Sequence, residues 1–157
     1  MNIAILTNNE DTVYDLLENL IFYLWEGDRI YITDDNSSPE YFSELSSFCK
    51  ENNIILYQHS MNKDFSQQRN FVHDMLPQNE WIVWLDSDEM VDIAFLNYLH
   101  GHIDSFNTDT VYCMPRINIY FEGDKFDFSS MEMDWVHPSG IAYPDPQGRI
   151  VYNTPSK

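Results

Sequence analysis

Three carboxylates follow an apolar run in the middle of the chain. Residues 81–85 (WIVWL) lead directly into Asp86, Asp88 and Glu89. An uninterrupted apolar run closed by polar residues is typical of a central strand in a parallel sheet, where ligands bind at the strand ends. Two carboxylates about 6 Å apart repel by roughly 3 kcal/mol at an effective dielectric of 20. The pair therefore favours a hard divalent cation, Mn²⁺ or Mg²⁺, which prefers carboxylate oxygens and leaves positions open for phosphate.

The same residues also suit the beginning of a helix. Ser and Asp are common N-cap residues, and acidic side chains stabilise the first helical turn. Asp86 and Asp88 would then have no role in ligand binding, and their removal would lower stability without changing affinity for any ligand. Spacing alone leaves both interpretations open.

The overall composition excludes several classes of partner. The 157 residues include 26 acidic and only 8 basic ones, for a formal net charge of −18. Nucleic acids and anionic membranes are recognised by clustered Lys and Arg, so we expect neither as a partner. Cys49 and Cys113 form no CxxC pair and are expected to be reduced thiols. No apolar run approaches about 18 residues, so we expect no transmembrane segment and a cytoplasmic protein.

Apolar strands alternate with amphipathic helices along residues 1–105. Such alternation predicts parallel strands joined by right-handed crossovers, with helices on both faces of the sheet. Ser37 and Glu40 are predicted to form a capping box for the second helix. The fold class is therefore α/β, a Rossmann-like three-layer sandwich with a mostly parallel sheet. The expected strands cover residues 3–6, 29–33, 54–57 and 81–85, and the expected helices run from Val13 to near Gly27, from Pro39 to near Asn52, from Phe65 to Leu76 and from Val91 to His102.

Polar residues follow three of these strands, which end along one edge of a parallel sheet and so can line a single crevice. They are residues 7–10 (TNNE), 34–35 (DD) and 86–89 (DSDE). The glycine-rich patterns GxGxxG and GxxxxGK[ST], the GxSxG elbow and the HExxH zinc motif are all absent from the sequence. The crevice is therefore expected to hold a nucleotide through carboxylates and a metal.

Four segments in order carry a resemblance to a known family: residues 5–10 (ILTNNE), 33–38 (TDDNSS), 64–70 (DFSQQRN) and 84–89 (WLDSDE). Together they resemble the family 2 inverting glycosyltransferases of the GT-A fold, and most of all the subgroup related to lipopolysaccharide-core glucosyltransferases. Residues 143–149 (YPDPQGR) are similar to a YPDxQxR segment of that subgroup. The resemblance covers nearly all of the chain.

The resemblance implies roles for residues at the first two strand ends. Thr7, Asn9 and Glu10 would border the nucleotide, and Asp35 would accept a hydrogen bond from the base. Without the resemblance, Thr7 and Asn9 are equally suited to capping the first helix, and Asp35 is an ordinary turn residue.

The resemblance also assigns the diphosphate and the metal. Arg69 would lie near the diphosphate, where a guanidinium can bind two oxygens at once. Asp86 would face the ribose and the metal, and Asp88 would ligate the Mn²⁺ or Mg²⁺ that bridges the diphosphate. An arginine on a helix is otherwise commonly solvated or paired with a surface acid.

The catalytic base is the part of the family pattern that the sequence does not supply. Inverting members use a carboxylate well beyond the acidic motif, and this sequence stops at Lys157. We expect the base region and the acceptor-binding helices to be missing, which leaves Glu132, Asp134 and Asp145 as candidates. We expect one domain over residues 1–157, with residues 1–105 as the nucleotide-binding half and residues 106–157 as a partial acceptor-side layer.

The sequence thus predicts a metal-dependent glycosyltransferase that uses a nucleotide-diphosphate sugar, with a UDP-sugar as the expected donor. The acceptor would be a saccharide or a lipid-linked saccharide, and transfer would invert the anomeric configuration. One alternative is a module that binds the nucleotide sugar with impaired catalysis. Another is a nucleotidyltransferase, which normally needs a basic, glycine-rich loop after the first strand; residues 7–11 contain neither Gly nor Lys.

Overall fold

The computed structural model describes residues 1–116, 121–122, 125–126 and 145–155. Within these residues the chain forms a six-stranded sheet in the order β3-β2-β1-β4-β8-β5, and β6 pairs with β7 in a separate two-stranded sheet. The strands are β1 (Asn2–Thr7), β2 (Arg29–Asp34), β3 (Ile55–Gln58), β4 (Trp81–Asp86), β5 (Tyr112–Arg116), β6 (Phe121–Glu122), β7 (Lys125–Phe126) and β8 (Asp145–Tyr152). The helices are α1 (Thr12–Tyr23), α2 (Pro39–Glu51), α3 (Phe65–Met75) and α4 (Ile93–His102), followed by the 3₁₀ turn η1 (Ile103–Ser105).

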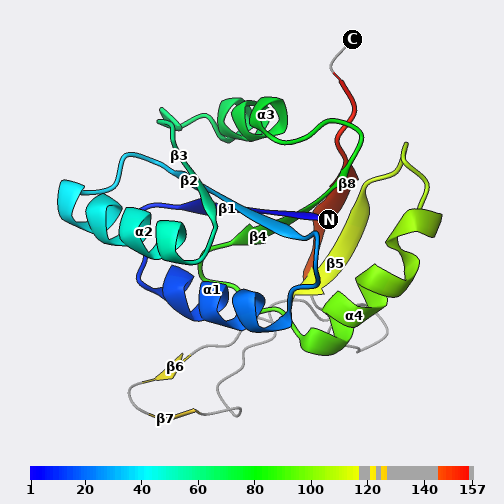
Figure 1. The fold of residues 1–157 in the computed structure, drawn as a ribbon, viewed down its shortest axis with the longest axis horizontal. Helices are drawn as coiled ribbons and strands as arrows, with labels where there is room; N and C mark the ends of the chain where they lie inside the picture. Colours follow the sequence, from blue (N-terminus) through cyan, green and yellow to red (C-terminus); the bar gives the residue numbers. More distant parts are fainter. Residues whose placement is uncertain (117–120, 123–124, 127–144, 156–157) are drawn as a thin grey trace.

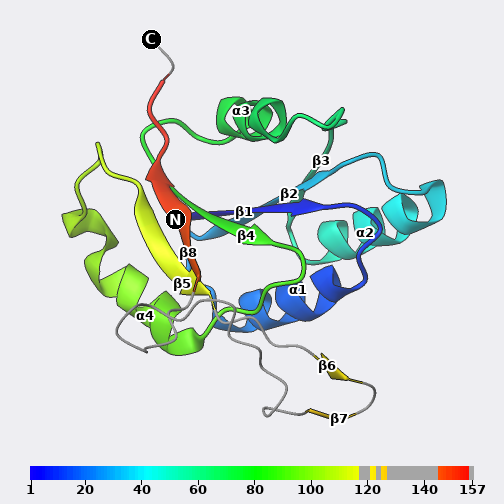
Figure 2. The ribbon, with the colours of Figure 1, turned by 180° about the vertical axis from the view of Figure 1, so that it is seen from behind.

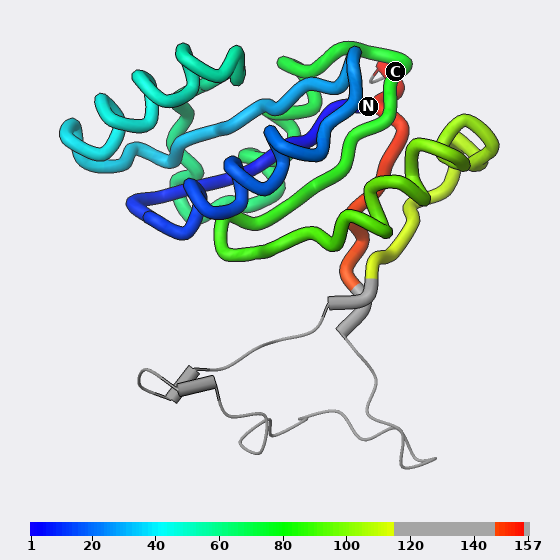
Figure 3. Tube along the Cα trace, turned by 60° about the horizontal axis from the view of Figure 1, so that its bottom comes forward, coloured from blue at the N-terminus to red at the C-terminus, as the bar shows by residue number. Residues whose placement is uncertain are grey.

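The order of the strands reverses between β1 and β4. The chain passes from β1 outward to β2 and β3, then returns through α3 and places β4 on the other side of β1. These four strands are parallel, with Leu6 opposite both Thr33 and Asp86. They therefore end on the same side of the sheet, which Figure 3 shows for β1, β2 and β4. In open α/β sheets, ligands bind in the crevice at such a switch point.

Helices cover both faces of the sheet, as the sequence predicted. Figures 1 and 2 show α3 on one face and α1, α2 and α4 on the other. On the first face, α3 packs Val72 and Leu76 against strand residues such as Ile82. The opposite face holds the larger core, in which helix residues such as Leu16, Leu45 and Leu96 pack against the same strands. Among the described residues, no helix is both long enough and apolar enough to cross a membrane.

The predicted capping box before α2 is wrong. The N-cap residue is Ser38, whose hydroxyl oxygen accepts a hydrogen bond from the backbone N–H of Tyr41. The Ser37 hydroxyl oxygen instead accepts the backbone N–H of Asn9 from the loop after β1. Ser37 therefore connects two strand ends, and a neighbouring serine takes over the local capping role.

The interpretation of residues 86–89 as the start of a helix is also wrong. Helix α4 begins at Ile93, and its N-cap is Asp92, whose carboxylate accepts the backbone N–H of Ala94. A turn closed by a hydrogen bond from the Glu89 N–H to the Asp86 carbonyl separates β4 from this helix. Asp86 is therefore the last residue of β4, Asp88 lies in the connection between this strand and α4, and neither caps the helix.

The last part of the sheet differs most from the sequence prediction. Proline cannot donate a hydrogen bond to a neighbouring strand, so Pro115 predicts a break after Met114, but β5 continues through Pro115 to Arg116. Strand β8 was not predicted as a long strand, because its eight residues include Pro146 and Gly148. It runs antiparallel between β4 and β5 and pairs with both. This insertion brings Arg149 next to the end of β4.

Candidate functional site

An arginine from β8 holds the acidic end of β4. The two terminal nitrogens of Arg149 donate to the two carboxylate oxygens of Asp86, at 3.1 Å and 2.6 Å. One of these nitrogens also donates to a Glu89 oxygen at 2.6 Å. The other Glu89 oxygen accepts the backbone N–H of Asp86 at 2.9 Å. The Arg149 side chain is only 5% exposed, whereas that of Asp86 is 44% exposed.

The electrostatics of Arg149 reflect this environment. Burial by itself lowers the pKa of the guanidinium, because it disfavours the charged form. Hydrogen bonding to Asp86 and the charges of Asp86, Glu89 and Asp88 outweigh burial and raise the pKa overall. Arg149 is therefore a fixed positive charge beside the carboxyl end of β4.

Glu10 and Asp88 complete the acidic cluster. Burial raises the pKa of Glu10, and the negative charges of Asp88 and then Asp86 raise it further. The pairing of β1 with β4, in which Leu6 lies opposite Asp86, places the loop after β1 beside the loop after β4. Asp88 is exposed, and no hydrogen bond or ion pair to it occurs within the part of the chain that the structure describes. The cluster thus has one carboxylate pair around Arg149 and two further acids facing the crevice.

On the other side of the switch point, neutral hydrogen bonds join the ends of β1 and β2. The Tyr41 hydroxyl of α2 donates to the Glu10 carbonyl at 2.9 Å. Its oxygen lies 3.0 Å from the Thr7 hydroxyl, so Thr7 donates to Tyr41 in this arrangement. The Thr7 side chain is buried, and its hydrogen bond to Tyr41 connects the end of β1 to α2.

Asn9 connects the same two loops from the exposed side. Its backbone has a φ of 49°, in the left-handed region that asparagine tolerates better than most residues. Its N–H donates to the Ser37 hydroxyl oxygen, and its side-chain oxygen accepts the N–H of Ser38, both at 2.8 Å. Asn9 therefore orients the first turn of α2, and it caps no part of α1.

The two aspartates after β2 have different environments. Asp34 is fully buried, and one of its oxygens accepts the Ser37 N–H and the Gln58 side-chain amide. Its other oxygen has no hydrogen-bond partner among the described residues. Asp35 is half-buried, and one of its oxygens accepts the N–H of Met61 at 2.7 Å. Asp35 thus fixes the loop after β3 through one of its two carboxylate oxygens.

Arg69 reaches the site from α3. Its guanidinium carbon lies 5.7 Å from the centre of the Trp84 ring, within the range of a cation–π contact. Trp84 and Asp86 are two residues apart on β4 and so point to the same face of the sheet. Arg69 is exposed and therefore stands over the face of β4 on which Asp86 lies.

The sequence also singled out three candidates for the catalytic base. Glu132 and Asp134, two candidates for the catalytic base, lie outside the described residues. Asp145, the third, is the first residue of β8. Among the described residues, no group of three or more His, Cys, Asp or Glu side chains could hold a metal ion. The described part of the chain thus offers fewer than three such ligands in one place.

The cluster still fits a hard divalent ion that has a second source of oxygen atoms. Asp88 and Glu10 provide carboxylate oxygens, the preferred ligands of Mn²⁺ and Mg²⁺. Mg²⁺ is commonly bound by one or two carboxylates together with substrate phosphates. The donor set therefore suits a metal–diphosphate pair better than a metal alone.

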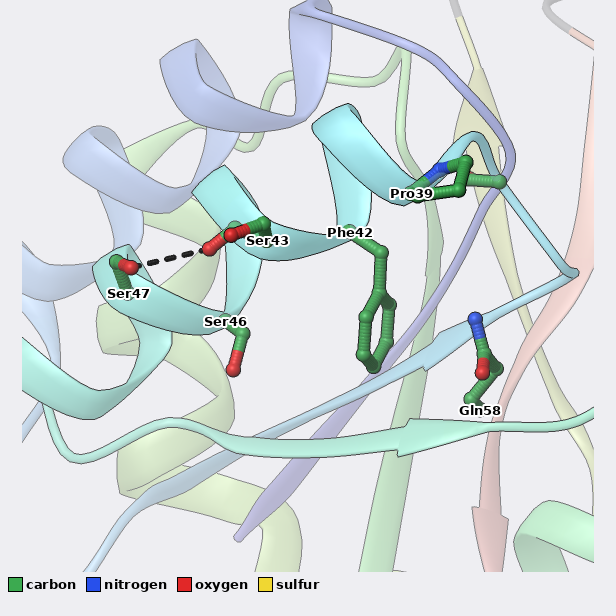
Figure 4. A pocket seen from close by; sticks show the side chains of 7 residues that line it. Pro39, Phe42, Ser43, Ser46, Ser47 and Gln58 are labelled. Carbon is green, nitrogen blue, oxygen red and sulfur yellow. Dashed lines mark hydrogen bonds between the residues drawn. The ribbon is translucent and has the colours of Figure 1, made fainter.

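A separate cavity of about 520 Å³ lies between α2 and the edge strand β3. Figure 4 shows Phe42 and Ser46 pointing into it from α2, and Gln58 facing them from β3. None of its lining residues is charged, and the acidic cluster takes no part in it. The lining consists of Ser37, Pro39, Phe42, Ser43, Ser46, Ser47 and Gln58. This cavity therefore has neither a cationic side chain to neutralise a diphosphate nor a carboxylate to ligate a metal ion.

Arg149 is the residue of this site that sequence reasoning missed. The YPDPQGR segment was recognised, but no role followed from it, because nothing local shows which strand β8 joins. A signal was available in the composition. With 8 basic against 26 acidic residues, an arginine after a proline- and glycine-containing stretch has few alternatives to pairing with an acid.

Several solved structures share this fold at low sequence identity. S. aureus TarS 1-349 in complex with UDP aligns with a TM-score of 0.62 and 14% identity, over 97% of this chain and 46% of TarS 1-349. The same protein with UDP-GlcNAc aligns with a TM-score of 0.58 and 13% identity, over 97% of this chain and 44% of that one. Mannosyltransferase PcManGT from Pyrobaculum calidifontis, with GDP-Man and Mn²⁺, aligns with a TM-score of 0.58 and 14% identity, over 74% of this chain and 34% of that one.

These likenesses establish a GT-A-like α/β fold, and this chain spans less than half the length of each of these three structures. No curated protein sequence matches the chain. The family model described as "Glycosyl transferase family 2" matches residues 3–152, which include the whole six-stranded sheet except Asn2, the first residue of β1. By this match the chain belongs to glycosyltransferase family 2.

Proposed function

We propose that this chain binds a nucleotide-diphosphate sugar together with a divalent metal and takes part in glycosyl transfer. The observation that carries the proposal is the placement of Glu10, Asp86 and Asp88 at the adjacent ends of β1 and β4, at the switch point of the sheet. Membership of glycosyltransferase family 2 supports it. So do neighbours of the same fold whose structures contain UDP, UDP-GlcNAc or GDP-Man with Mn²⁺.

The nucleoside would lie over the hydrogen-bonded ends of β1 and β2. Asp35 would accept a hydrogen bond from the base through the oxygen that does not bind Met61. Thr7 and Asn9 would border the nucleotide mainly by holding the loops in place, since their side-chain oxygens already bond to α2 and its N-terminus. We expect a UDP-sugar as the donor, on the basis of the resemblance to the lipopolysaccharide-core subgroup.

The diphosphate would lie over the end of β4. Asp88 would ligate Mn²⁺ or Mg²⁺, and Asp86 would face the ribose and the metal. Arg69 would approach the phosphates from α3, because it stands over the face of the strand that carries Asp86. A bound metal ion would act as a Lewis acid that stabilises the departing nucleoside diphosphate. Glu10 would border the same region. Its negative charge would repel the phosphates unless the metal ion were bound as well.

Transfer would be an in-line displacement with inversion at the anomeric carbon, toward a saccharide or lipid-linked saccharide acceptor. The base that deprotonates the acceptor hydroxyl would be one of three carboxylates, Glu132, Asp134 or Asp145. A second candidate function is a donor-binding module with impaired catalysis. The groups at the strand ends, such as Asp35 and Asp86, suit binding of a donor, and none of them is a candidate for the base.

Calorimetric titration of UDP and GDP with and without Mn²⁺ tests the proposal. The variants are Asp88→Asn and the matched control Asp74→Asn, which removes an exposed carboxylate from the last turn of α3. Because α3 runs opposite to the strands, Asp74 lies at the far edge of the sheet. We expect metal-dependent binding in the wild type and the control, weakened at least about tenfold in Asp88→Asn.

A folded wild-type protein that binds neither nucleotide would contradict the proposal. Binding without donor hydrolysis or transfer, over a panel of UDP- and GDP-sugars with saccharide acceptors, would identify the chain as a donor-binding module. Release of the nucleoside diphosphate only when Mn²⁺ and an acceptor are present would establish the enzyme.

A further inference from the structure

Arg149 is the most constrained charged group at the proposed site. It comes from the middle of β8, which is paired on both sides, by β4 and by β5. Its side chain is 5% exposed, and it makes three hydrogen bonds of 2.6 to 3.1 Å to two carboxylates. A guanidinium held in this two-point geometry has little freedom to move away. Arg149 is thus a permanent feature of the acidic cluster.

These contacts limit what the cluster offers to a metal ion in the absence of nucleotide. Arg149 occupies both oxygens of Asp86 and one oxygen of Glu89, whose other oxygen binds the backbone N–H of Asp86. Glu10 and Asp88 are left to receive a cation. This agrees with the absence, among the described residues, of any group of three or more possible ligands.

The positive charge of Arg149 acts in the same direction. A divalent ion beside Asp88 approaches the guanidinium as well, because Arg149 is bonded to Asp86, only two residues before Asp88. At roughly 6 Å, the repulsion between a divalent ion and one positive charge changes affinity by about tenfold even at the dielectric constant of water. Arg149 therefore weakens metal binding both by holding Asp86 and by repulsion.

We propose that Arg149 makes metal binding conditional on the nucleotide: the empty site binds Mn²⁺ or Mg²⁺ poorly, and the diphosphate supplies the missing oxygens and negative charge. This inference rests on the function proposed above, and it assigns Arg149 as a positioning residue. Metal and nucleotide then bind with positive coupling, and each raises the affinity for the other by the same factor. The site would then bind little metal ion when no nucleotide sugar is bound.

Electron paramagnetic resonance of Mn²⁺ measures the key quantity, the affinity of the nucleotide-free protein for the metal alone. We expect Arg149→Met to bind Mn²⁺ about tenfold more tightly than the wild type, because it removes the repulsion and releases Asp86. The matched control is Arg29→Met, which removes an exposed arginine at the opposite end of the strands. It should leave the Mn²⁺ affinity unchanged. The coupling between UDP and Mn²⁺ should fall in Arg149→Met and stay unchanged in Arg29→Met.

An unchanged or weaker Mn²⁺ affinity in folded Arg149→Met would overturn the inference. If that variant does not fold, Asp86→Asn and Asp88→Asn keep it testable, since both are isosteric. Asp86→Asn should weaken Mn²⁺ binding to the nucleotide-free protein clearly less than Asp88→Asn does, because Arg149 already holds Asp86. Equal losses would contradict the role of Arg149. Failure of the wild type to bind UDP with Mn²⁺ would instead contradict the proposed function, whatever the result with Mn²⁺ alone.

Discussion

The two flanks of the β1–β4 switch point are built in different ways. On the β1–β2 flank, neutral hydrogen bonds join the strand ends, as between Tyr41 and Glu10 or between Asn9 and Ser37. On the β4–β8 flank, Arg149 is paired with Asp86 and Glu89 within an acidic cluster. The first flank is largely complete without a ligand. The second keeps an exposed carboxylate, Asp88, and an excess of negative charge.

The two flanks therefore suit different parts of the nucleotide. A preformed, neutral surface suits a nucleoside, because its recognition depends on shape and on a few fixed acceptors. An acidic surface suits a diphosphate only through a bridging metal. Substitutions on the first flank should therefore change stability first, whereas substitutions on the second should change metal and nucleotide affinity first. The predictions below test that distinction, from the largest expected effect to the smallest.

Asp34→Ala should have the largest effect on folding. It removes the buried acceptor of the Ser37 N–H and the Gln58 amide. A buried donor left without a partner costs about 1–3 kcal/mol, so we expect the free energy of unfolding to fall by about 2–3 kcal/mol. Urea denaturation monitored by tryptophan fluorescence measures the change. A loss below about 0.5 kcal/mol would show that the β2 end does not depend on this carboxylate.

Tyr41→Phe should have a smaller effect on the same flank. It removes the hydroxyl that bridges Thr7 and Glu10, at a cost of about 1–2 kcal/mol in the free energy of unfolding. Tyr14→Phe is the matched control, because the neighbouring Tyr14 hydroxyl is buried without a hydrogen-bond partner among the described residues. That control should leave stability unchanged or raise it. Equal losses in the two variants would mean that ring packing, not the hydroxyl bridge, holds the loops.

Glu10→Gln should stabilise the nucleotide-free protein at neutral pH. Burial and the charges of Asp88 and Asp86 raise the pKa of Glu10 in the folded state, so its ionised form opposes folding. That penalty is present above the raised pKa, fades as the pH falls through it, and is absent below the ordinary carboxyl value. The side chain is largely exposed, so screening reduces the expected gain to about 0.5 kcal/mol. Urea denaturation at pH 7 and near pH 4 measures the gap between variant and wild type, and a gap that does not narrow at low pH would contradict this account.

The two cysteines should react with an alkylating agent at different rates in the folded protein. Burial in the core beneath α2 raises the pKa of Cys49 to about 11, whereas Cys113 on β5 is exposed. Since the thiolate is the reactive form, we expect alkylation at pH 8 to be at least about 100-fold slower at Cys49. Mass spectrometry after timed treatment with iodoacetamide distinguishes the two sites. Comparable rates would mean that the α2 side of the sheet opens readily in solution.

Much of the fold could be predicted because its signals are local. The apolar run before Asp86 predicts β4 as a buried strand, and the helical spacing of Val13, Leu16 and Leu20 predicts α1. The polar strand ends were also local signals, so the positions of Glu10 and Asp86 on one edge followed from parallel topology alone. The predicted positions of such residues depend on the local sequence and on the direction of the strands.

The parts that could not be predicted depend on contacts between distant segments. Ser37 and Ser38 are both suitable caps, and only the approach of Asn9 from another loop decides which one caps α2. The contact of Arg149 with Asp86 joins residues 63 positions apart in the sequence. Arg149 lies on β8, a strand that the sequence does not predict because Pro and Gly are uncommon inside strands. No local pattern shows that such a strand inserts between β4 and β5. The charge balance of the site followed only from the structure.

A crystal structure with UDP and Mn²⁺ would test the central claim most directly, because anomalous scattering locates the metal independently of the model. The account predicts a single strong manganese peak about 2 Å from an Asp88 oxygen, bridged to the diphosphate, with Arg149 still next to Glu89. The base would lie over the ends of β1 and β2, near Asp35. UDP bound instead in the serine-lined cavity beside α2, or a metal peak away from the end of β4, would contradict it.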